Sequence, residues 1–122
     1  MYLFRYNTFY SPVLTVHFYM SGNGREPVRD WLRSLPDGDR RAIGEDIKTV
    51  QFGWPLGMPL VRKMEADLWE VRSNIPAGIA RVLFTTDEDT MILLHGFVKK
   101  SDKTPAADLK LARQRKREAH NG

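Results

Sequence analysis

Four short extended runs occupy residues 60–98 and constrain the fold more than any other feature of the sequence. The runs are Leu60–Met64, Leu68–Ser73, Ile79–Thr86 and Thr90–Val98. Short turns of polar and small residues separate them, and strands joined by short turns pair antiparallel with their neighbours along the chain. The sequence therefore predicts an antiparallel meander of four strands.

One further strand and three helices flank this meander. The β-branched and aromatic run Val13–Met20 predicts a first strand. Apolar stripes predict two helices after it, one from Pro27 with Val28, Trp31, Leu32 and Leu35, and one over Asp39–Phe52 with Ile43, Ile47 and Val50. Thr104-Pro105 has the pattern of an N-cap followed by proline and predicts a basic helix to about Glu118. The order β-α-α-β-β-β-β-α indicates an α+β fold with helices on one sheet face.

The length of 122 residues predicts a single domain, 1–122, around one hydrophobic core. Residues 1–12 precede the first strand and form either an extended start of the fold or a flexible arm, and the sequence leaves both interpretations open. The chain has no cysteine, which excludes disulfides, thiolate zinc sites and cysteine nucleophiles. No apolar stretch approaches the roughly 20 residues of a membrane span, and no signal-peptide pattern is present, so we expect a cytoplasmic protein without membrane contact.

Basic charge is concentrated at the end of the chain. Residues 1–98 carry eleven basic and twelve acidic side chains, whereas residues 99–122 carry eight basic and three acidic ones. A basic segment behind a nearly neutral body indicates a polyanionic partner, either a nucleic acid or an acidic protein. A solvated basic helix explains the same charges without a partner, and the composition leaves both interpretations open.

Strand alternation predicts that charged side chains gather on the sheet face opposite the first two helices. In the second and third runs of the meander, Glu70, Arg72 and Arg81 alternate with apolar residues. The last run divides into His95, Phe97 and Lys99 on one face and Leu94, Gly96 and Val98 on the other. We therefore expect an open face that collects Glu70, Arg72, Arg81 and His95, with Lys99 and Lys100 at its edge.

Such a face has the groups needed to bind RNA and to cleave it without a metal. Arginine pairs bidentately with phosphate, and an aromatic ring such as that of Phe97 can stack on a base. Cleavage requires a base for the 2′-hydroxyl, cations for the charged phosphorane and an acid for the 5′-oxygen. His95 and Glu70 are candidates for proton transfer, and Arg72, Arg81 or a lysine could hold the phosphate.

Structural explanations compete with each of these assignments. Arg72 could pair with Glu70 or a neighbouring strand, Arg81 could belong to a buried pair, and His95 could be a hydrogen-bonded structural residue. The lysines after the last strand could be a solvated cluster. Core and loop packing accounts for the three tryptophans, Trp31, Trp54 and Trp69. The three histidines are far apart in the sequence, which predicts no metal site.

The segments LWEVRS, IARVLF and HGFVKKSDKTP resemble the phage-derived HigB-like branch of the RelE/ParE toxin superfamily. The similarity continues through GREPVRDWLRSLP, IGEDIKTVQFGWPLGMPLVRK and DLKLAR, about 100 of the 122 residues in the same order. This resemblance implies a RelE-like fold, with two N-terminal helices packed on a twisted antiparallel sheet and a basic C-terminal helix. It also implies the toxin of a type II toxin–antitoxin system that cleaves mRNA, commonly in the ribosomal A site, without a metal.

The resemblance assigns roles to individual residues. By position, Arg72 and Arg81 match the strand arginines that bind and stabilise the phosphate. Lys99, Lys100 and Lys103 match the basic stretch that completes the RNA site, and Lys63 and Phe97 are added as RNA-binding candidates. Glu70 and His95 are candidate acid–base groups. The C-terminal tyrosine that some RelE members use is absent, so the choice of acid and base stays open.

Partners follow from the same resemblance. It implies a cognate helix-turn-helix antitoxin that covers the basic surface or displaces the C-terminal helix, and operator DNA is bound only through that antitoxin. The other expected partners are mRNA and the ribosome, and no cofactor is expected. Two alternatives remain, a non-enzymatic ParE-like inhibitor of DNA gyrase and an inactive antitoxin-binding regulator.

Overall fold

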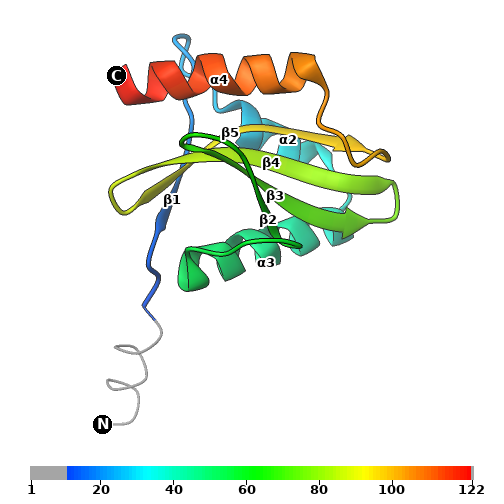
Figure 1. The fold of residues 1–122 in the computed structure, drawn as a ribbon. Helices are drawn as coiled ribbons and strands as arrows, with labels where there is room; N and C mark the ends of the chain where they lie inside the picture. The colour runs from blue at the N-terminus through cyan, green and yellow to red at the C-terminus, as the bar shows by residue number, and fades with distance from the viewer. Residues whose placement is uncertain (1–10, 122) are drawn as a thin grey trace, which may run out of the picture.

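The computed structural model describes residues 11–121 and arranges them in three layers, with a five-stranded sheet between helices (Figure 1). The elements are β1 (Thr15–Phe18), α2 (Pro27–Ser34), α3 (Asp37–Gly53), β2 (Val61–Glu65), β3 (Leu68–Ile75), β4 (Gly78–Asp87), β5 (Thr90–Lys99) and α4 (Ala106–Asn121). This order confirms the predicted one. Of the extended start or flexible arm expected at residues 1–12, residues 1–10 lie outside the described part of the chain. None of the helices within residues 11–121 is long and apolar enough to cross a membrane.

Strands β2 to β5 form the predicted meander, in which each strand pairs antiparallel with the next. The turns between them are short, and Ala66-Asp67 alone joins β2 to β3. Asp67 and Glu88 adopt φ angles of 57° and 53°, the left-handed conformation that tight hairpin turns require. Because turns this short allow only antiparallel pairing, the local sequence determines this part of the fold.

The first strand does not follow the predicted antiparallel arrangement. The strand order is β1-β5-β4-β3-β2, and β1 pairs parallel to β5, with Thr15 beside Thr90 and Phe18 beside Leu93. The sheet is therefore mixed, and the prediction of a wholly antiparallel sheet is wrong. Parallel neighbours need a long connection, and here two helices and three strands separate β1 from β5 along the chain.

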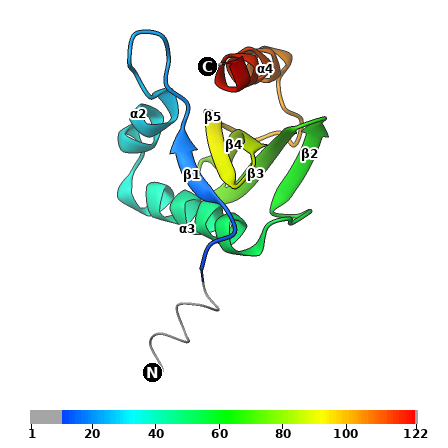
Figure 2. The same ribbon diagram turned by 90° about the vertical axis from the view of Figure 1, so that its left-hand side faces the viewer.

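Helices α2 and α3 cover one face of the sheet, as predicted (Figure 2). The main buried side chains of this core are Val28, Ile43, Ile47 and Val50 from the helices and Val71, Ala80, Val82 and Phe84 from β3 and β4. Trp31, Trp54 and Trp69 pack against the same core, which confirms their predicted role. The rings of Trp54 and Trp69 meet edge to face, with their centroids 5.0 Å apart.

Helix α4 covers the opposite face of the sheet, where the sequence predicts an open surface (Figure 1). Leu109 and Ala112 of α4 pack with Leu68 and Leu83 of the strands in a second, smaller cluster. Helices thus cover both faces, and the prediction of one covered face is wrong. The apolar stripe of α4 is short and lies among basic residues, so charge dominates the sequence pattern of this helix.

A β-bulge in β5 places Leu94 beneath α4. The β4–β5 register pairs Leu83 with His95 and Phe84 with Leu93, which leaves Leu94 as the extra residue. Leu94 is fully buried in the cluster under α4. Its predicted position on the face of Gly96 is therefore wrong, because one extra residue reverses the alternation of a strand.

Gly96→Ala is expected to destabilise the fold. A Cβ atom at this position would overlap the ring of Trp31, so α2 would have to move away from β5. We expect the free energy of unfolding, measured by urea denaturation, to fall by about 1–3 kcal/mol. Gly44→Ala on α3 is the matched control, because no atom beyond the adjacent residues and the backbone of its own helix lies within 4 Å of the added Cβ, and alanine favours a helix. Wild-type stability of Gly96→Ala would contradict the close packing of α2 on β5.

Candidate functional site

Strand register brings Glu70, Arg72, Arg81 and His95 onto one face of the sheet, as strand alternation predicts. Arg72 of β3 lies directly beside Arg81 of β4, and Arg81 lies beside Phe97 of β5. The adjacent row of the same face holds Glu70 and His95, with one β4 residue between them. Two rows of neighbouring strand residues therefore contain all four candidates.

This face is covered, so the predicted open site is wrong in that respect. Glu70 and Arg81 are 0% exposed, and the side chain of Arg72 is 10% exposed. The cover consists of α4 and of the segment Ser101–Asp108, which leads from β5 into that helix (Figure 1). The apolar stripe of α4 packs on the same face around Leu68 and Leu83, whereas Ser101, Asp102 and Thr104 contact the two arginines and Glu70.

Both carboxylate oxygens of Glu70 accept hydrogen bonds. Oε1 accepts one from Nη1 of Arg72 at 2.7 Å, and Oε2 accepts one from the Thr104 hydroxyl at 2.6 Å. The sequence predicts Thr104 as the cap of α4, but the helix begins at Ala106 and the hydroxyl bonds to Glu70 instead. These two bonds offset the cost of burying the carboxylate. The Arg72 contact also agrees with the structural explanation for that pair.

Arg81 is a buried cation with unused hydrogen-bond donors. Its Nη2 donates to the carbonyl oxygen of Ser101, and its guanidinium carbon lies 5.8 Å from the ring centroid of Phe97. Nε and Nη1 have no hydrogen-bond partner among the described residues. Burial lowers the pKa of Arg81, and the negative charge of Glu70 opposes that shift. A guanidinium in this condition favours an anion that can accept from its free donors.

His95 is held by the first turn of α4. Its Nε2 lies 2.6 Å from Oδ1 of Asp108, and its ring stacks on that of Phe97 with the centroids 5.5 Å apart. The side chains of His95 and Asp108 are 15% and 22% exposed, so this edge of the site is nearer to solvent than Arg81 is. A carboxylate that fixes one imidazole nitrogen leaves the other available for proton transfer.

The candidate RNA-binding lysines separate into two groups. Those at the end of β5 and just after it are all exposed, namely Lys99, Lys100 and Lys103. Arg62, which the sequence pattern does not single out, joins this group because its Nη1 donates to the Asp102 carbonyl oxygen at 3.3 Å. Lys63 is exposed but pairs with Trp69, whose ring packs in the core on the α3 side. The structure therefore does not bring Lys63 to the face of the two arginines.

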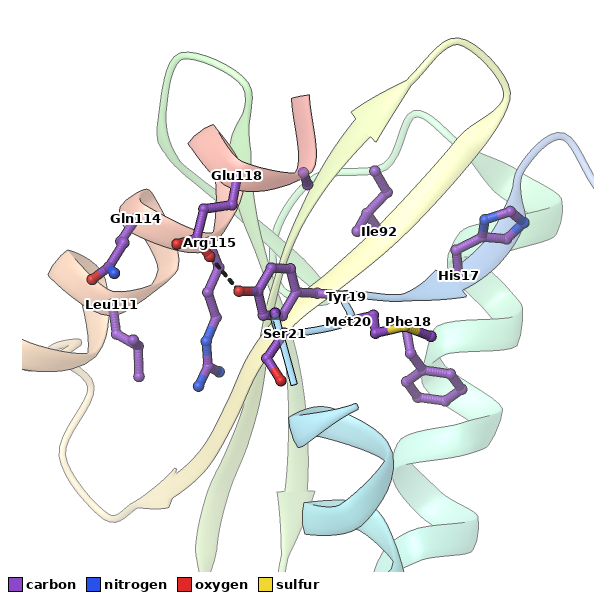
Figure 3. Close-up of a pocket in the computed structure, with 12 residues that line it drawn as sticks. His17, Phe18, Tyr19, Met20, Ser21, Ile92, Leu111, Gln114, Arg115 and Glu118 are labelled. Carbon is purple, nitrogen blue, oxygen red and sulfur yellow. Dashed lines mark hydrogen bonds between the residues drawn. The ribbon is translucent and has the colours of Figure 1, made fainter. Parts of the chain in front are cut away.

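A separate hollow of about 730 Å³ lies between the end of β1 and the second half of α4 (Figure 3). Tyr19 donates a hydrogen bond to Glu118 across it, and Arg115 lies over the Tyr19 ring and donates to the Leu94 carbonyl oxygen at 2.9 Å. The hydrogen bond to Glu118, and then burial, raise the pKa of Tyr19. These contacts fasten the second half of α4 to the sheet, and no predicted site residue lines the hollow.

The covered cluster has the composition of a phosphate site with acid–base groups. Two guanidinium groups can bind a phosphate and stabilise added negative charge, while a carboxylate and an imidazole can transfer protons. Within residues 11–121, no group of three or more histidine, aspartate or glutamate side chains could hold a metal ion. Alternation finds the strand residues of this cluster, but it could not find Thr104 or Asp108, because both belong to the irregular segment and the helix that fold over the sheet.

A family model described as "Phage derived protein Gp49-like (DUF891)" matches residues 30–117. The match begins within α2 and ends within α4, so it contains the whole meander and every predicted site residue. A search of curated proteins gave no match.

Glu70→Gln is expected to destabilise the protein. The amide nitrogen cannot accept a hydrogen bond, so either Arg72 or Thr104 loses its partner in a buried place. We expect the free energy of unfolding to fall by about 1–3 kcal/mol in urea denaturation. Glu88→Gln in the exposed β4–β5 turn makes the same chemical change and is expected to shift stability by less than about 0.5 kcal/mol. Equal stability of the two variants would contradict the hydrogen bonds assigned to Glu70.

Tyr19→Phe is expected to remove a pH-dependent part of the stability. The bond to Glu118 raises the pKa of Tyr19 above 10.0, so its neutral form is favoured in the folded state. The resulting stability is present below pH 10 and is lost as the pH rises through the raised pKa. Wild type is expected to exceed Tyr19→Phe by about 1 kcal/mol at pH 7. That difference, measured by urea denaturation at pH 7 to 11, is expected to shrink above pH 10, and a constant difference would contradict the assignment.

Proposed function

The chain belongs to the family of phage-derived Gp49-like proteins, and on that premise we propose that it is the toxin of a type II toxin–antitoxin system. Proteins of this family are commonly of the toxin–antitoxin type. The proposed activity is that of an mRNA endoribonuclease, an mRNA interferase that cleaves ribosome-bound message without a metal. The resemblance of the strand segments and of HGFVKKSDKTP to RelE-like toxins supports this choice.

Arg72 and Arg81 lie side by side on neighbouring strands with Glu70 and His95 in the adjacent row, and this observation carries the proposal. In the proposed reaction the 2′-oxygen loses its proton to a base and attacks the phosphorus. The bond to the 5′-oxygen breaks, and that oxygen takes a proton from an acid, which leaves a 2′,3′-cyclic phosphate and a 5′-hydroxyl. The arginines stabilise the phosphorane, and Glu70 and His95 share the roles of base and acid.

Exposed groups around the cluster would position the RNA. Lys99, Lys100 and Lys103 are exposed and can contact successive phosphates, and Arg62 lies beside them. Phe97 lies beside Arg81 in the sheet and offers a ring for base stacking. Lys63 is not part of this proposal, because it belongs to the other face of the sheet.

The proposed partners are those of a toxin of this class. They are mRNA on the ribosome, in the cytoplasm, and a cognate helix-turn-helix antitoxin through which the complex binds operator DNA. The excess of basic over acidic residues from Lys99 onward, eight against three, supports a polyanionic or acidic partner for this region.

Burial of Glu70 and Arg81 favours a second candidate function. Fully covered groups cannot touch a substrate in this conformation, and a protein that acts by binding alone does not need them. The alternatives are a non-enzymatic ParE-like inhibitor of DNA gyrase and an inactive regulator that only binds the antitoxin.

Arg72→Met and Arg81→Met are expected to lower mRNA cleavage by at least about 100-fold each, because a preorganised cation stabilises the phosphorane. Methionine keeps much of the side-chain volume, and circular dichroism verifies that each variant is folded before its cleavage is compared with that of wild type. The measurement is 5′-end mapping of a reporter mRNA in a cell-free translation reaction with the purified full chain. Arg41→Met on the exposed surface of α3 is the matched control and is expected to cleave like wild type.

The same reactions separate the alternatives. Cleavage within codons only when ribosomes are present would support the ribosome-dependent nuclease, and cleavage of naked RNA would remove the ribosome from the proposal. Intact message in both reactions would contradict the nuclease. Loss of supercoiling by purified gyrase would then identify the ParE-like alternative, and unaltered supercoiling would leave the antitoxin-binding regulator.

A further inference from the structure

The segment Ser101–Asp108, here called the strap, is bonded to each of the four candidate catalytic residues. Two of the contacts are with the arginines. The carbonyl oxygen of Ser101 accepts a hydrogen bond from Arg81, and a carboxylate oxygen of Asp102 lies 3.5 Å from Nη2 of Arg72. The strap thus presents a negatively polarised carbonyl oxygen and a charged carboxylate oxygen to the arginines. A phosphate presents oxygens of the same kind to arginine.

The other two contacts hold the acid–base candidates. The Thr104 hydroxyl donates to Glu70 at 2.6 Å in a fully buried bond, and Asp108 holds Nε2 of His95 at 2.6 Å. The strap therefore occupies the carboxylate and the imidazole that would transfer protons to and from a reacting phosphodiester. No candidate catalytic side chain is left without a contact to the strap.

We propose that the strap is a built-in cover that stands in for RNA phosphate in the free chain and must leave before an RNA backbone reaches Arg72 and Arg81. This inference rests on the proposed function and adds a regulation of the same site. The Ser101 carbonyl and the Asp102 carboxylate occupy donors that phosphate oxygens require. Strap and RNA therefore compete for the same cations.

The incomplete pairing of Arg81 favours exchange of the strap for phosphate. The strap supplies one acceptor to this guanidinium, whereas Nε and Nη1 have none among the described residues. A phosphate carries several acceptor oxygens and can satisfy two guanidinium donors at once. Once the strap has opened, an RNA phosphate thus pairs with Arg81 better than the strap does.

The strap can open while most of α4 stays in place. Residues 101–103 are exposed, so little apolar burial holds them. The later turns of α4 are fastened independently, by the Tyr19–Glu118 bond and by a 2.8 Å hydrogen bond from Nε of Arg113 to Glu65. Opening is therefore a local event and does not require the helix to leave the sheet.

The first test weakens the strap without changing any candidate catalytic residue. Thr104→Val/Asp108→Ala removes the strap partners of Glu70 and His95. Hydrogen–deuterium exchange of the full-length variant is expected to be faster at residues 101–108 than in wild type, with the strands unchanged. Thr86→Val/Asp87→Ala at the end of β4 replaces the same residue types with the same change in net charge and is expected to leave the strap unaltered.

The second test measures competition with RNA. The probe is a twelve-nucleotide RNA with 2′-O-methyl groups throughout, which cannot be cleaved through its 2′-oxygens. The strap variant is expected to bind it about tenfold more tightly than wild type, because a larger fraction of the chain is open. The control variant is expected to bind within about twofold of wild type, since it shares the gain in charge but not the open strap. Saturating wild type with the probe is expected to speed exchange at residues 101–108.

Each outcome of these measurements supports or overturns the proposed cover. If the probe binds wild type but exchange at residues 101–108 is unchanged or slower, RNA binds elsewhere and the strap is no cover, while the RNA-binding function survives. If the strap variant exchanges faster yet binds no more tightly than the control, the proposal is overturned in the same way. If no variant binds the probe, the cover is overturned, while the ribosome-dependent nuclease is decided separately by the 5′-end mapping.

Discussion

The buried guanidinium of Arg81 is the constraint on which the covered face depends. Arg81 lies on β4, the central strand of the sheet, and has no exposed surface. A buried charge is costly unless neighbouring groups compensate for it. Glu70 supplies the opposing charge, the Ser101 carbonyl accepts one hydrogen bond, and Phe97 offers the face of its ring. The position of the segment between β5 and α4 is tied to this requirement, because Ser101 belongs to it.

That compensation is incomplete, which argues for a ligand rather than for stability. An apolar side chain at the centre of β4 would avoid the cost of burying a charge. Two guanidinium nitrogens of Arg81 are buried without a partner among the described residues, and each such group adds a further cost. An anion with several oxygens would remove this cost. The arrangement is therefore better explained by a site that exchanges one set of oxygens for another than by a closed structural ion pair.

Local sequence patterns predict those parts of the molecule that local geometry decides. Short turns allow only antiparallel neighbours, so the meander is predictable, and alternation places Glu70 and Arg81 on the same face. The partner of β1 is not predictable, because β5 lies at the other end of the chain. The cover is likewise not predictable from the sequence, since the bonds of Thr104 and Asp108 depend on how the segment after β5 folds over the sheet. Accessibility of the site is thus a tertiary property, and the sequence pattern yields only its composition.

Under the proposed cover, stability and RNA binding are opposing properties of the same side chains. Its four contacts are each worth about 0.5–1.5 kcal/mol, less for the largely exposed Asp102. The sum keeps the free chain mostly closed but stays within what several phosphate contacts can supply on binding. A change that strengthens the strap therefore raises the stability of the free chain and lowers its affinity for RNA by the same free energy. Stability and affinity of strap variants should accordingly vary in opposite directions, whereas core variants such as Gly96→Ala should lower stability without raising affinity.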